Sequence, residues 1–311
     1  MMAAIKERAS GLYRNFIMTQ AEKLGLDNRM ALAKAINKRR YSKLVERRRA
    51  LLRDPAYLDY TAAVDAVTID DGWRVPAGQL SFAGHPIIAD SQAILREQRE
   101  VKSHKGFMVN HLTWRDLSAY PSFIEAALHP VVLKTAGTYL GMYPVLSSVK
   151  LLVSLPGTYS KFTSSQLYHL DHADRPLLKL IINVNEVTAD SGPLCFLPAS
   201  ASKTAKQALG YGRRGAAYRV DDETMCRVAA CHSMVQLRGA LGDTAFVDTS
   251  QCFHYGSRNA SRERRIVMYS FSTPVRSDFR RPNDYSTARA CSSVIERALL
   301  DPYFSADAAE R

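Results

Sequence analysis

The sequence is poor in cysteine. Its 311 residues include five cysteines, and no two of them form a Cys-x-x-Cys pair. The run Cys226-x4-Cys231-His232 does not have the spacing of a zinc ribbon and has no second ligand pair, so we interpret these cysteines as ordinary residues. An odd and sparse set of cysteines argues against a disulfide scaffold and favours a reducing compartment.

The sequence also lacks long hydrophobic runs. No segment approaches the roughly 20 apolar residues that a membrane-spanning helix needs. Lys6, Glu7, Arg8 and Arg14 interrupt the first twenty residues, which argues against a secretory signal. This basic start could mimic an organelle transit peptide, but an ordinary N-terminal helix is the favoured interpretation. We therefore predict a cytoplasmic protein without a membrane partner.

The chain has fewer acidic than basic residues. The chain has 42 Lys and Arg against 30 Asp and Glu, and residues 1–60 hold 14 of the former and 6 of the latter. A local positive field could attract an acidic partner or an anionic substrate. The favoured interpretation is that these charges form a solvated helical face and bind no specific partner. Nucleic-acid binding is disfavoured because the basic helix lacks interleaved aromatic residues.

Hydrophobic residues, in contrast, are abundant and make up 46% of the chain. Their spacing follows one pattern in the first part of the chain and another in the second. The first part of the chain is mostly helical in pattern. Residues 30–52 and 121–141 predict helices, the second with Pro130 in a first turn and Gly141 at its end. A short final helix is predicted near residues 293–300.

From Leu146 onward the pattern changes to short aliphatic and β-branched runs between turn residues. We predict strands at residues 149–155, 166–169, 177–187, 194–197, 234–237, 244–247 and 266–271. So many short strands in succession are typical of a sandwich or jelly roll. The predicted fold class is β-rich α+β. We expect residues 1–120 to form a helical region packed on a β core of residues 121–311. Residues 200–232 would be an insertion and a lid over the site.

Two polar motifs stand out in the strand-rich part. His169 and Asp171 are two residues apart, so on a strand both side chains project from one face. His254 follows a predicted strand far along the chain. Two imidazoles and one carboxylate can hold one face of a non-haem Fe(II) and leave the other face open. The alternative is a strand histidine and a turn carboxylate. His172 is expected to point away, and His85, His104 and His111 are interpreted as structural.

An arginine follows on the last predicted strand. Arg265 alternates with Val267, Tyr269 and Phe271, so we predict that it points into the apolar interior. A buried guanidinium requires an anion, and its fork fits a carboxylate. Arg264 is the rival and is expected to point the other way.

These segments together resemble the phytanoyl-CoA dioxygenase family of Fe(II)/2-oxoglutarate oxygenases. The resemblance spans about residues 130–275 and depends on residues 166–171, 175–184, 190–198 and 242–254 together with the Arg265 strand. It implies a double-stranded β-helix. It also implies iron on His169, Asp171 and His254, a salt bridge from Arg265 to 2-oxoglutarate, and O2 as the second cosubstrate.

Two further residues, Ser257 and Lys179, are softer candidates for the 2-oxoglutarate pocket. Family members that halogenate lack the carboxylate ligand, so Asp171 favours hydroxylation. The expected substrate is a small molecule, and the positive charge of the chain favours an anionic one such as an acyl thioester, phosphonate or carboxylate. Natural-product hydroxylation is an equal alternative. The competing function is a non-catalytic jelly roll that binds an anion or nucleic acid through its basic N-terminal region.

Overall fold

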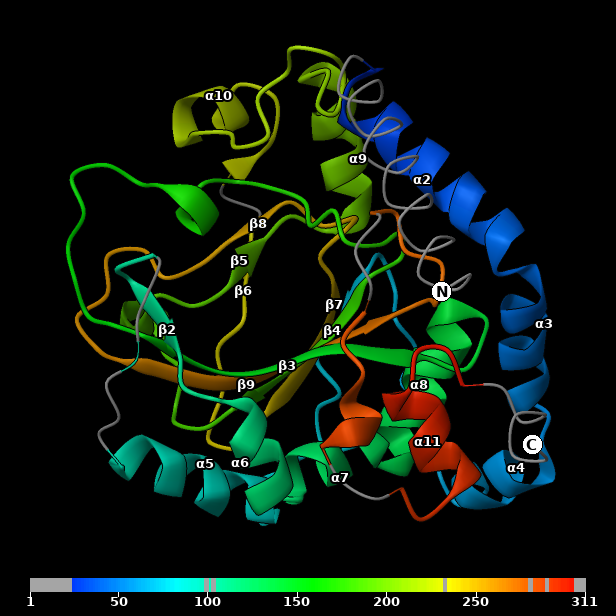
Figure 1. Cartoon of the computed structure of the whole chain (residues 1–311). Coiled ribbons are helices and arrows are strands. Elements are labelled where there is room, and N and C mark those ends of the chain that lie inside the picture. The colour runs from blue at the N-terminus through cyan, green and yellow to red at the C-terminus, as the bar shows by residue number, and fades with distance from the viewer. Residues whose placement is uncertain are drawn as a thin grey trace, which may run out of the picture.

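The computed structural model describes residues 24–97, 101, 105–231, 234–278, 282–288 and 291–304. The first part of the basic N-terminal region, His104 and His232 lie outside the described residues. Within the described parts, the strands form two antiparallel sheets that face each other, and helices pack around them (Figure 1).

The larger sheet has six strands in the order β1-β7-β4-β9-β3-β2. The strands are β1 (Trp73–Arg74), β2 (Met108–Asn110), β3 (Val145–Ser154), β4 (Leu178–Asn183), β7 (Thr244–Asp248) and β9 (Arg264–Ser272). The longest pairing is β3 with β9, which is antiparallel from Val145↔Ser272 to Ser154↔Arg264. Because β1 and β2 come from the first 120 residues, the predicted helical region also supplies both edges of this sheet.

The smaller sheet has the order β6-β5-β8, with β5 (Cys195–Phe196), β6 (Val235–Gln236) and β8 (His254–Tyr255). A single bridge between His169 and His254 adds the segment around His169 beside β8. The two sheets make the double-stranded β-helix that was predicted, a jelly roll built into a mixed helix and antiparallel-sheet protein.

Helices cover the outer face of the larger sheet (Figure 1). They include α4 (Pro55–Thr61), α5 (Pro86–Arg96), α6 (Trp114–Ala119), α7 (Ser122–Leu128), α8 (Pro130–Leu140) and α11 (Val294–Leu300). Their apolar sides and the sheet form one continuous core that includes Phe123, Leu133, Val267, Tyr269 and Phe271, all fully buried. The predicted domain boundary near residue 120 falls between α6 and α7, two helices that contribute to this same core.

A smaller core lies between the two sheets. Leu152, Ile181, Phe196, Val247 and Ile266 meet there. The inner face of the larger sheet is therefore only partly apolar, and the space left at one end of this core is the pocket described below.

Most predicted elements are present, with three local differences. The predicted helix at 121–141 is two helices, α7 and α8, separated at His129. The predicted helix at 30–52 is two helices, α2 (Leu26–Arg40) and α3 (Ser42–Leu51), separated at Tyr41, which has φ −114°. The predicted strand at 166–169 is instead a turn of 3-10 helix, Ser164–Gln166, followed by isolated bridges. Gly141 ends α8 in the left-handed conformation at φ 66°, as expected for a helix C-cap.

The segment predicted as an insertion folds into α9 (Ala199–Ala208) and α10 (Asp222–Cys226). Leu26 and Met30 of α2 pack with Tyr211, Val220 and Met225 of this segment in a third core cluster. A single bridge joins Val220 to Tyr168, next to the predicted ligand His169. The segment is thus attached beside the site, and its closure as a lid stays a prediction.

The interpretation of Cys226 and Cys231 as ordinary residues was wrong. They form a disulfide, because the turn that follows α10 brings their Cα atoms to 5.4 Å. Cys195, Cys252 and Cys291 are free. In the described parts of the chain, no helix combines the length and the apolar character needed to cross a membrane.

Arg48 ties α3 to the core. Its side chain is fully buried, and its guanidinium donates to the carbonyl oxygens of Pro144 (3.0 Å), Ala298 (2.9 Å) and Asp301 (2.7 Å). Two of these carbonyls lie at the C-terminal end of α11, where a cation also complements the helix dipole. Arg48 therefore links three segments that are distant in sequence.

We expect Arg48→Ala to lower the free energy of unfolding by about 3 kcal/mol, because several buried carbonyls lose their donor and a cavity opens. Arg49→Ala, at the exposed neighbouring position, should change it by less than about 0.5 kcal/mol. Urea unfolding of both variants measures the difference. Equal stabilities for the two variants would contradict the role assigned to Arg48.

Candidate active site

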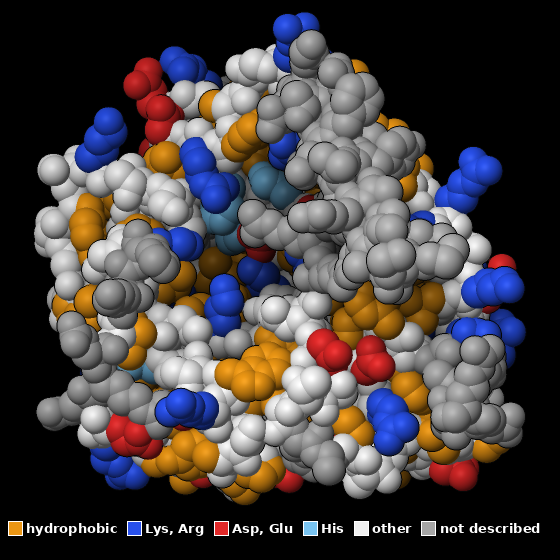
Figure 2. All heavy atoms as spheres, in the orientation of Figure 1, with side chains coloured by type: hydrophobic (Ala, Val, Ile, Leu, Met, Phe, Trp, Pro, Cys, Tyr) orange, Lys and Arg blue, Asp and Glu red, His pale blue; other side chains and the backbone are white. Residues whose placement is uncertain are grey.

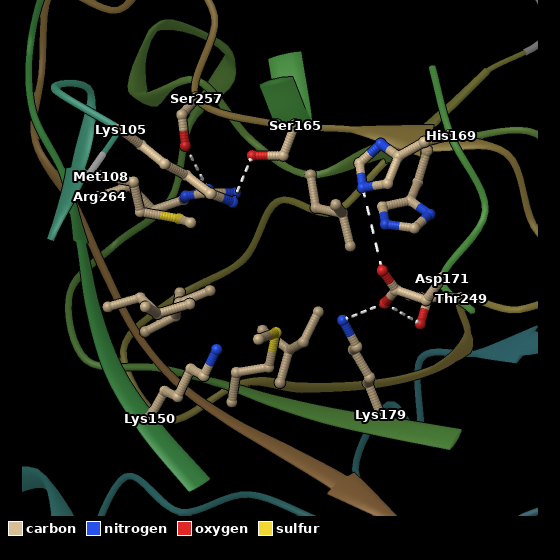
Figure 3. Close-up of a pocket in the computed structure, with 17 residues that line it drawn as sticks. Lys105, Met108, Lys150, Ser165, His169, Asp171, Lys179, Thr249, Ser257 and Arg264 are labelled. Carbon is tan, nitrogen blue, oxygen red and sulfur yellow. Dashed lines mark hydrogen bonds and ion pairs between the residues drawn. The ribbon is translucent and has the colours of Figure 1, made fainter. Parts of the chain in front are cut away.

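Three predicted metal ligands meet at the open end of the β-helix. One ligand atom each from His169, Asp171 and His254 can be chosen so that all three lie within 4.8 Å of one another. The backbones of His169 and His254 exchange two hydrogen bonds, each 3.1 Å long, which fixes the two histidines side by side. Asp171 is held by its own amide, which donates to the Thr249 carbonyl at 2.8 Å. The convergence predicted for these three residues is present. Figure 3 shows His169 and Asp171 on the same side of the pocket.

The hydrogen bonds of the two imidazoles determine which nitrogen faces the site. His169 Nδ1 lies 2.9 Å from the Leu167 carbonyl oxygen, and His254 Nδ1 lies 3.0 Å from that of Cys252. A carbonyl oxygen can only accept, so each Nδ1 carries the proton. Each Nε2 then presents a lone pair, which is the arrangement that metal-binding histidines adopt.

Burial keeps both imidazoles neutral. It lowers the pKa of His254 to about 4 and, together with the neighbouring His254, lowers the pKa of His169 to about 2. At neutral pH both rings are therefore neutral imidazoles, protonated at Nδ1 and free to bind a metal through Nε2.

The carboxylate of Asp171 is oriented through one oxygen. Oδ2 accepts from Thr249 Oγ1 at 2.8 Å and pairs with Lys179 Nζ at 2.5 Å. Oδ1 is left on the side of the histidines, 4.0 Å from His169 Nε2. Burial alone would raise the pKa of Asp171, but Lys179 and the two histidines outweigh it and hold the pKa well below its usual value. Asp171 is thus ionised and positioned as a ligand.

This donor set fits Fe(II). Two neutral imidazole nitrogens and one carboxylate on one side of a pocket form the facial arrangement used by non-haem iron oxygenases. The carboxylate is supported from outside by Thr249 and Lys179, as expected for a metal ligand.

A pocket of about 200 Å³ extends from the three ligands across the inner face of the larger sheet. The space-filling view shows histidine and cationic side chains around a hollow in the molecular surface that faces the viewer (Figure 2). Arg264 lies at the far side of the pocket from the histidines (Figure 3). Its side chain is only 4% exposed, and Nη2 donates to Ser154 Oγ (3.0 Å) and Ser257 Oγ (3.1 Å).

The Arg264 guanidinium has no carboxylate partner among the described residues, and its buried Nε has no hydrogen-bond acceptor there. Burial lowers the pKa of Arg264 to about 10, which leaves it charged at neutral pH. A buried cation without a counter-ion is costly, and a bound anion in the pocket would remove that cost. The far side of the pocket therefore has the charge and the hydrogen-bond donors to bind an anion, and it is called the anion site below.

The prediction that Arg265 points inward was wrong. Arg265 is 40% exposed and pairs with Glu263, and Arg264 takes the inward position. The reason is that both faces of β9 are covered. Val267, Tyr269 and Phe271 pack on the helices, whereas Arg264, Ile266 and Met268 line the pocket.

The two softer candidates both line the pocket. Ser257 contributes a hydroxyl that accepts from Arg264 and lies 2.7 Å from Ser154 Oγ. Lys179 lies at the other end, paired with Asp171. Ser257 thus belongs to the anion site, and Lys179 supports the metal ligand.

His172 points away from the three ligands, as predicted. Its ring packs near Tyr211 and Tyr218, and it is outside the group of residues that could hold a metal. His85 caps α5 by accepting from the amide of Ile87, a structural role that fits its interpretation. Several pocket residues were missed, among them the polar side chains of Lys105, Lys150 and Thr249. For Lys150 a signal existed, since a lysine at an alternating position of an apolar strand must face something other than a core.

The fold and the site together define a double-stranded β-helix protein with a two-histidine, one-carboxylate metal centre beside an anion pocket. No family model matches the chain, and no curated protein matches it in sequence.

Solved structures with similarity include the epimerase SnoN in complex with Fe3+, alpha ketoglutarate and nogalamycin RO, at 18% identity and TM-score 0.46, covering 70% of this chain and 84% of that one. The non-haem alpha ketoglutarate dependent carbocyclase SnoK, from nogalamycin biosynthesis, is 17% identical with TM-score 0.45, covering 70% and 83%. HygX from Streptomyces hygroscopicus, with nickel, 2-oxoglutarate and hygromycin B bound, is 13% identical with TM-score 0.37, covering 59% and 78%.

Proposed function

We propose that this protein is an Fe(II)- and 2-oxoglutarate-dependent oxygenase that oxidises a small organic molecule. The observation that carries the proposal is the pairing of a His169–Asp171–His254 centre with a buried, uncompensated Arg264 across one pocket. A dicarboxylate that reaches from the metal to a guanidinium satisfies both ends of this pocket. O2 is the second cosubstrate.

The pocket residues fall into two groups, one for the metal and one for 2-oxoglutarate. His169, Asp171 and His254 would hold Fe(II), which would supply the activation of O2. Arg264, with the hydroxyls of Ser154 and Ser257, would bind the distal carboxylate of 2-oxoglutarate.

The walls between these two ends are apolar. Leu152, Ile181, Leu194 and Ile266 line the pocket there. They would enclose the methylene part of the cosubstrate and exclude water from the metal, which protects a reactive centre from side reactions.

We further propose that the oxidation is a hydroxylation and that the protein is related to the phytanoyl-CoA dioxygenase family. The retained carboxylate ligand Asp171 supports hydroxylation, and the sequence segments that resemble the family include all three ligands. Hydroxylation would couple oxidation of the substrate to conversion of 2-oxoglutarate into succinate and CO2.

Succinate formation tests the function. Protein incubated aerobically with Fe(II), ascorbate and 2-oxoglutarate should release succinate slowly without a substrate and faster when a screened compound is accepted. Omission of Fe(II) or addition of a chelator should abolish the signal. Anaerobic calorimetry should show that 2-oxoglutarate binds only to metal-loaded protein. A protein that binds neither the metal nor 2-oxoglutarate would overturn the proposal and leave a non-catalytic jelly roll.

A further inference from the structure

The pocket has more positive charge than the proposed cofactor and cosubstrate can balance. Among the residues that the structure describes, the lining contains four cationic side chains, those of Lys105, Lys150, Lys179 and Arg264, and one carboxylate, that of Asp171. With Fe(II) and 2-oxoglutarate bound, the charges of the metal and Arg264 are cancelled by Asp171 and the two cosubstrate carboxylates. The charges of Lys150 and Lys179 remain, and like charges in one pocket repel one another unless an anion joins them.

Lys150 is the more informative of these two lysines, because Lys179 is already paired with Asp171. It lies in the middle of β3, opposite Met268 of β9, and its exposed side chain lines the pocket. Within the described residues it has no hydrogen-bond or ion-pair partner. Partial desolvation and the nearby Lys179 lower the pKa of Lys150. Figure 3 shows its side chain reaching into the pocket from the wall opposite Lys105 and Arg264.

A second cavity of about 490 Å³ continues from the first past Lys150, Lys179 and Asp171. Its other lining residues are largely polar and include Ser147, Ser270 and Asn283. The pocket therefore has two compartments that share these lysines: an inner one between the metal centre and Arg264, and an outer, polar one.

We infer that the prime substrate of the proposed oxygenase is an anion, a phosphate or a carboxylate, whose charged group is bound at Lys150 in the outer compartment. This inference rests on the proposed function, because the inner compartment must already be filled by 2-oxoglutarate. An anion at Lys150 would be held next to the metal centre, since Lys179 and Asp171 border both compartments. Lys105, which donates to Ser165 Oγ at 3.0 Å, adds to the positive field from across the pocket.

Small probes test the inference. Protein loaded with Zn(II) and saturated with 2-oxoglutarate is titrated with methyl phosphate and with butyrate, and separately with the uncharged trimethyl phosphate and methyl butyrate, at constant ionic strength. Binding is followed by ligand-observed NMR. We expect the anions to bind and the esters not to bind, and the tighter of the two anions identifies the chemical group.

The variants make the test specific. Lys150→Gln should weaken binding of the preferred anion by about tenfold or more, equivalent to about 1.4 kcal/mol. Its affinity for 2-oxoglutarate should stay within about twofold of the wild type. Lys203→Gln, at an exposed position on α9 outside both compartments, should behave like the wild type in both measurements.

Three results would overturn the inference: no binding of either anion, equal binding of anions and esters, or loss of 2-oxoglutarate rather than of the probe in Lys150→Gln. Loading with Zn(II) and 2-oxoglutarate is measured before the probes are added. A failure at that first step counts against the proposed function, and a failure confined to the probes counts against the anionic substrate alone.

Discussion

Arg264→Met is expected to lower the affinity of the metal-loaded protein for 2-oxoglutarate by about a hundredfold or more. The change removes the one buried guanidinium at the far side of the pocket, and an uncompensated carboxylate there would cost about 3 kcal/mol or more. Metal affinity should not change, because Arg264 and the ligands lie at opposite ends of the pocket (Figure 3). Anaerobic titration with 2-oxoglutarate measures the loss.

The same variant should fold at least as stably as the wild type. In the free protein Arg264 is a buried cation with an unsatisfied Nε, and the hydroxyls of Ser154 and Ser257 can still bond to each other at 2.7 Å after its removal. Arg265→Met is the matched control, since Arg265 pairs with Glu263 outside the pocket. If the Arg265 variant lost 2-oxoglutarate binding and the Arg264 variant kept it, the assignment of the anion site would be wrong.

His254→Gln should lower the affinity for Fe(II) or Zn(II) by at least about a hundredfold. Loss of one of three protein ligands costs more than the ten- to hundredfold effect typical of residues that only support a ligand. Glutamine preserves much of the volume, so the backbone pairing of His254 with His169 should persist. Competition with a coloured chelator measures the affinity, and circular dichroism checks the fold.

His172→Gln is the control for this experiment. His172 is adjacent to Asp171 in sequence, but its ring turns toward Tyr211 and Tyr218. The metal affinity of the His172→Gln variant should therefore match that of the wild type. A comparable loss in the His172 variant, or none in the His254 variant, would show that the metal lies elsewhere or is absent.

The sequence was sufficient for the fold class and for the three residues that converge. Short strands between turn residues predicted a jelly roll, and the His169–Asp171 spacing with a distant His254 predicted the cluster. The jelly roll could be predicted because alternation along a strand is a local property of the chain. The three residues converge although the strand expected at 166–169 is not formed, because a backbone bridge holds His169 beside His254.

Strand alternation did not identify which of Arg264 and Arg265 points into the pocket. The prediction assumed one buried face for β9, with the more apolar residues pointing toward the site. In fact the most apolar face packs on the helices, and the site takes the mixed face with Ile266 and Met268. Tertiary packing decides which face of β9 contacts the helices and which face lines the pocket. The alternation of residues along the strand does not contain this information. The Cys226–Cys231 disulfide was missed for a similar reason, since only the turn after α10 brings the two sulfurs together.

The mutual pairing of the His169 and His254 backbones has a consequence for the stability of the whole molecule. These residues are more than eighty positions apart, and α9 and α10 belong to the stretch between them. An ion bound to both side chains would act as a cross-link that closes this long loop, and a ligand that binds only the native state stabilises it by mass action. Supply of the metal would then govern the lifetime of the folded chain as well as its chemistry.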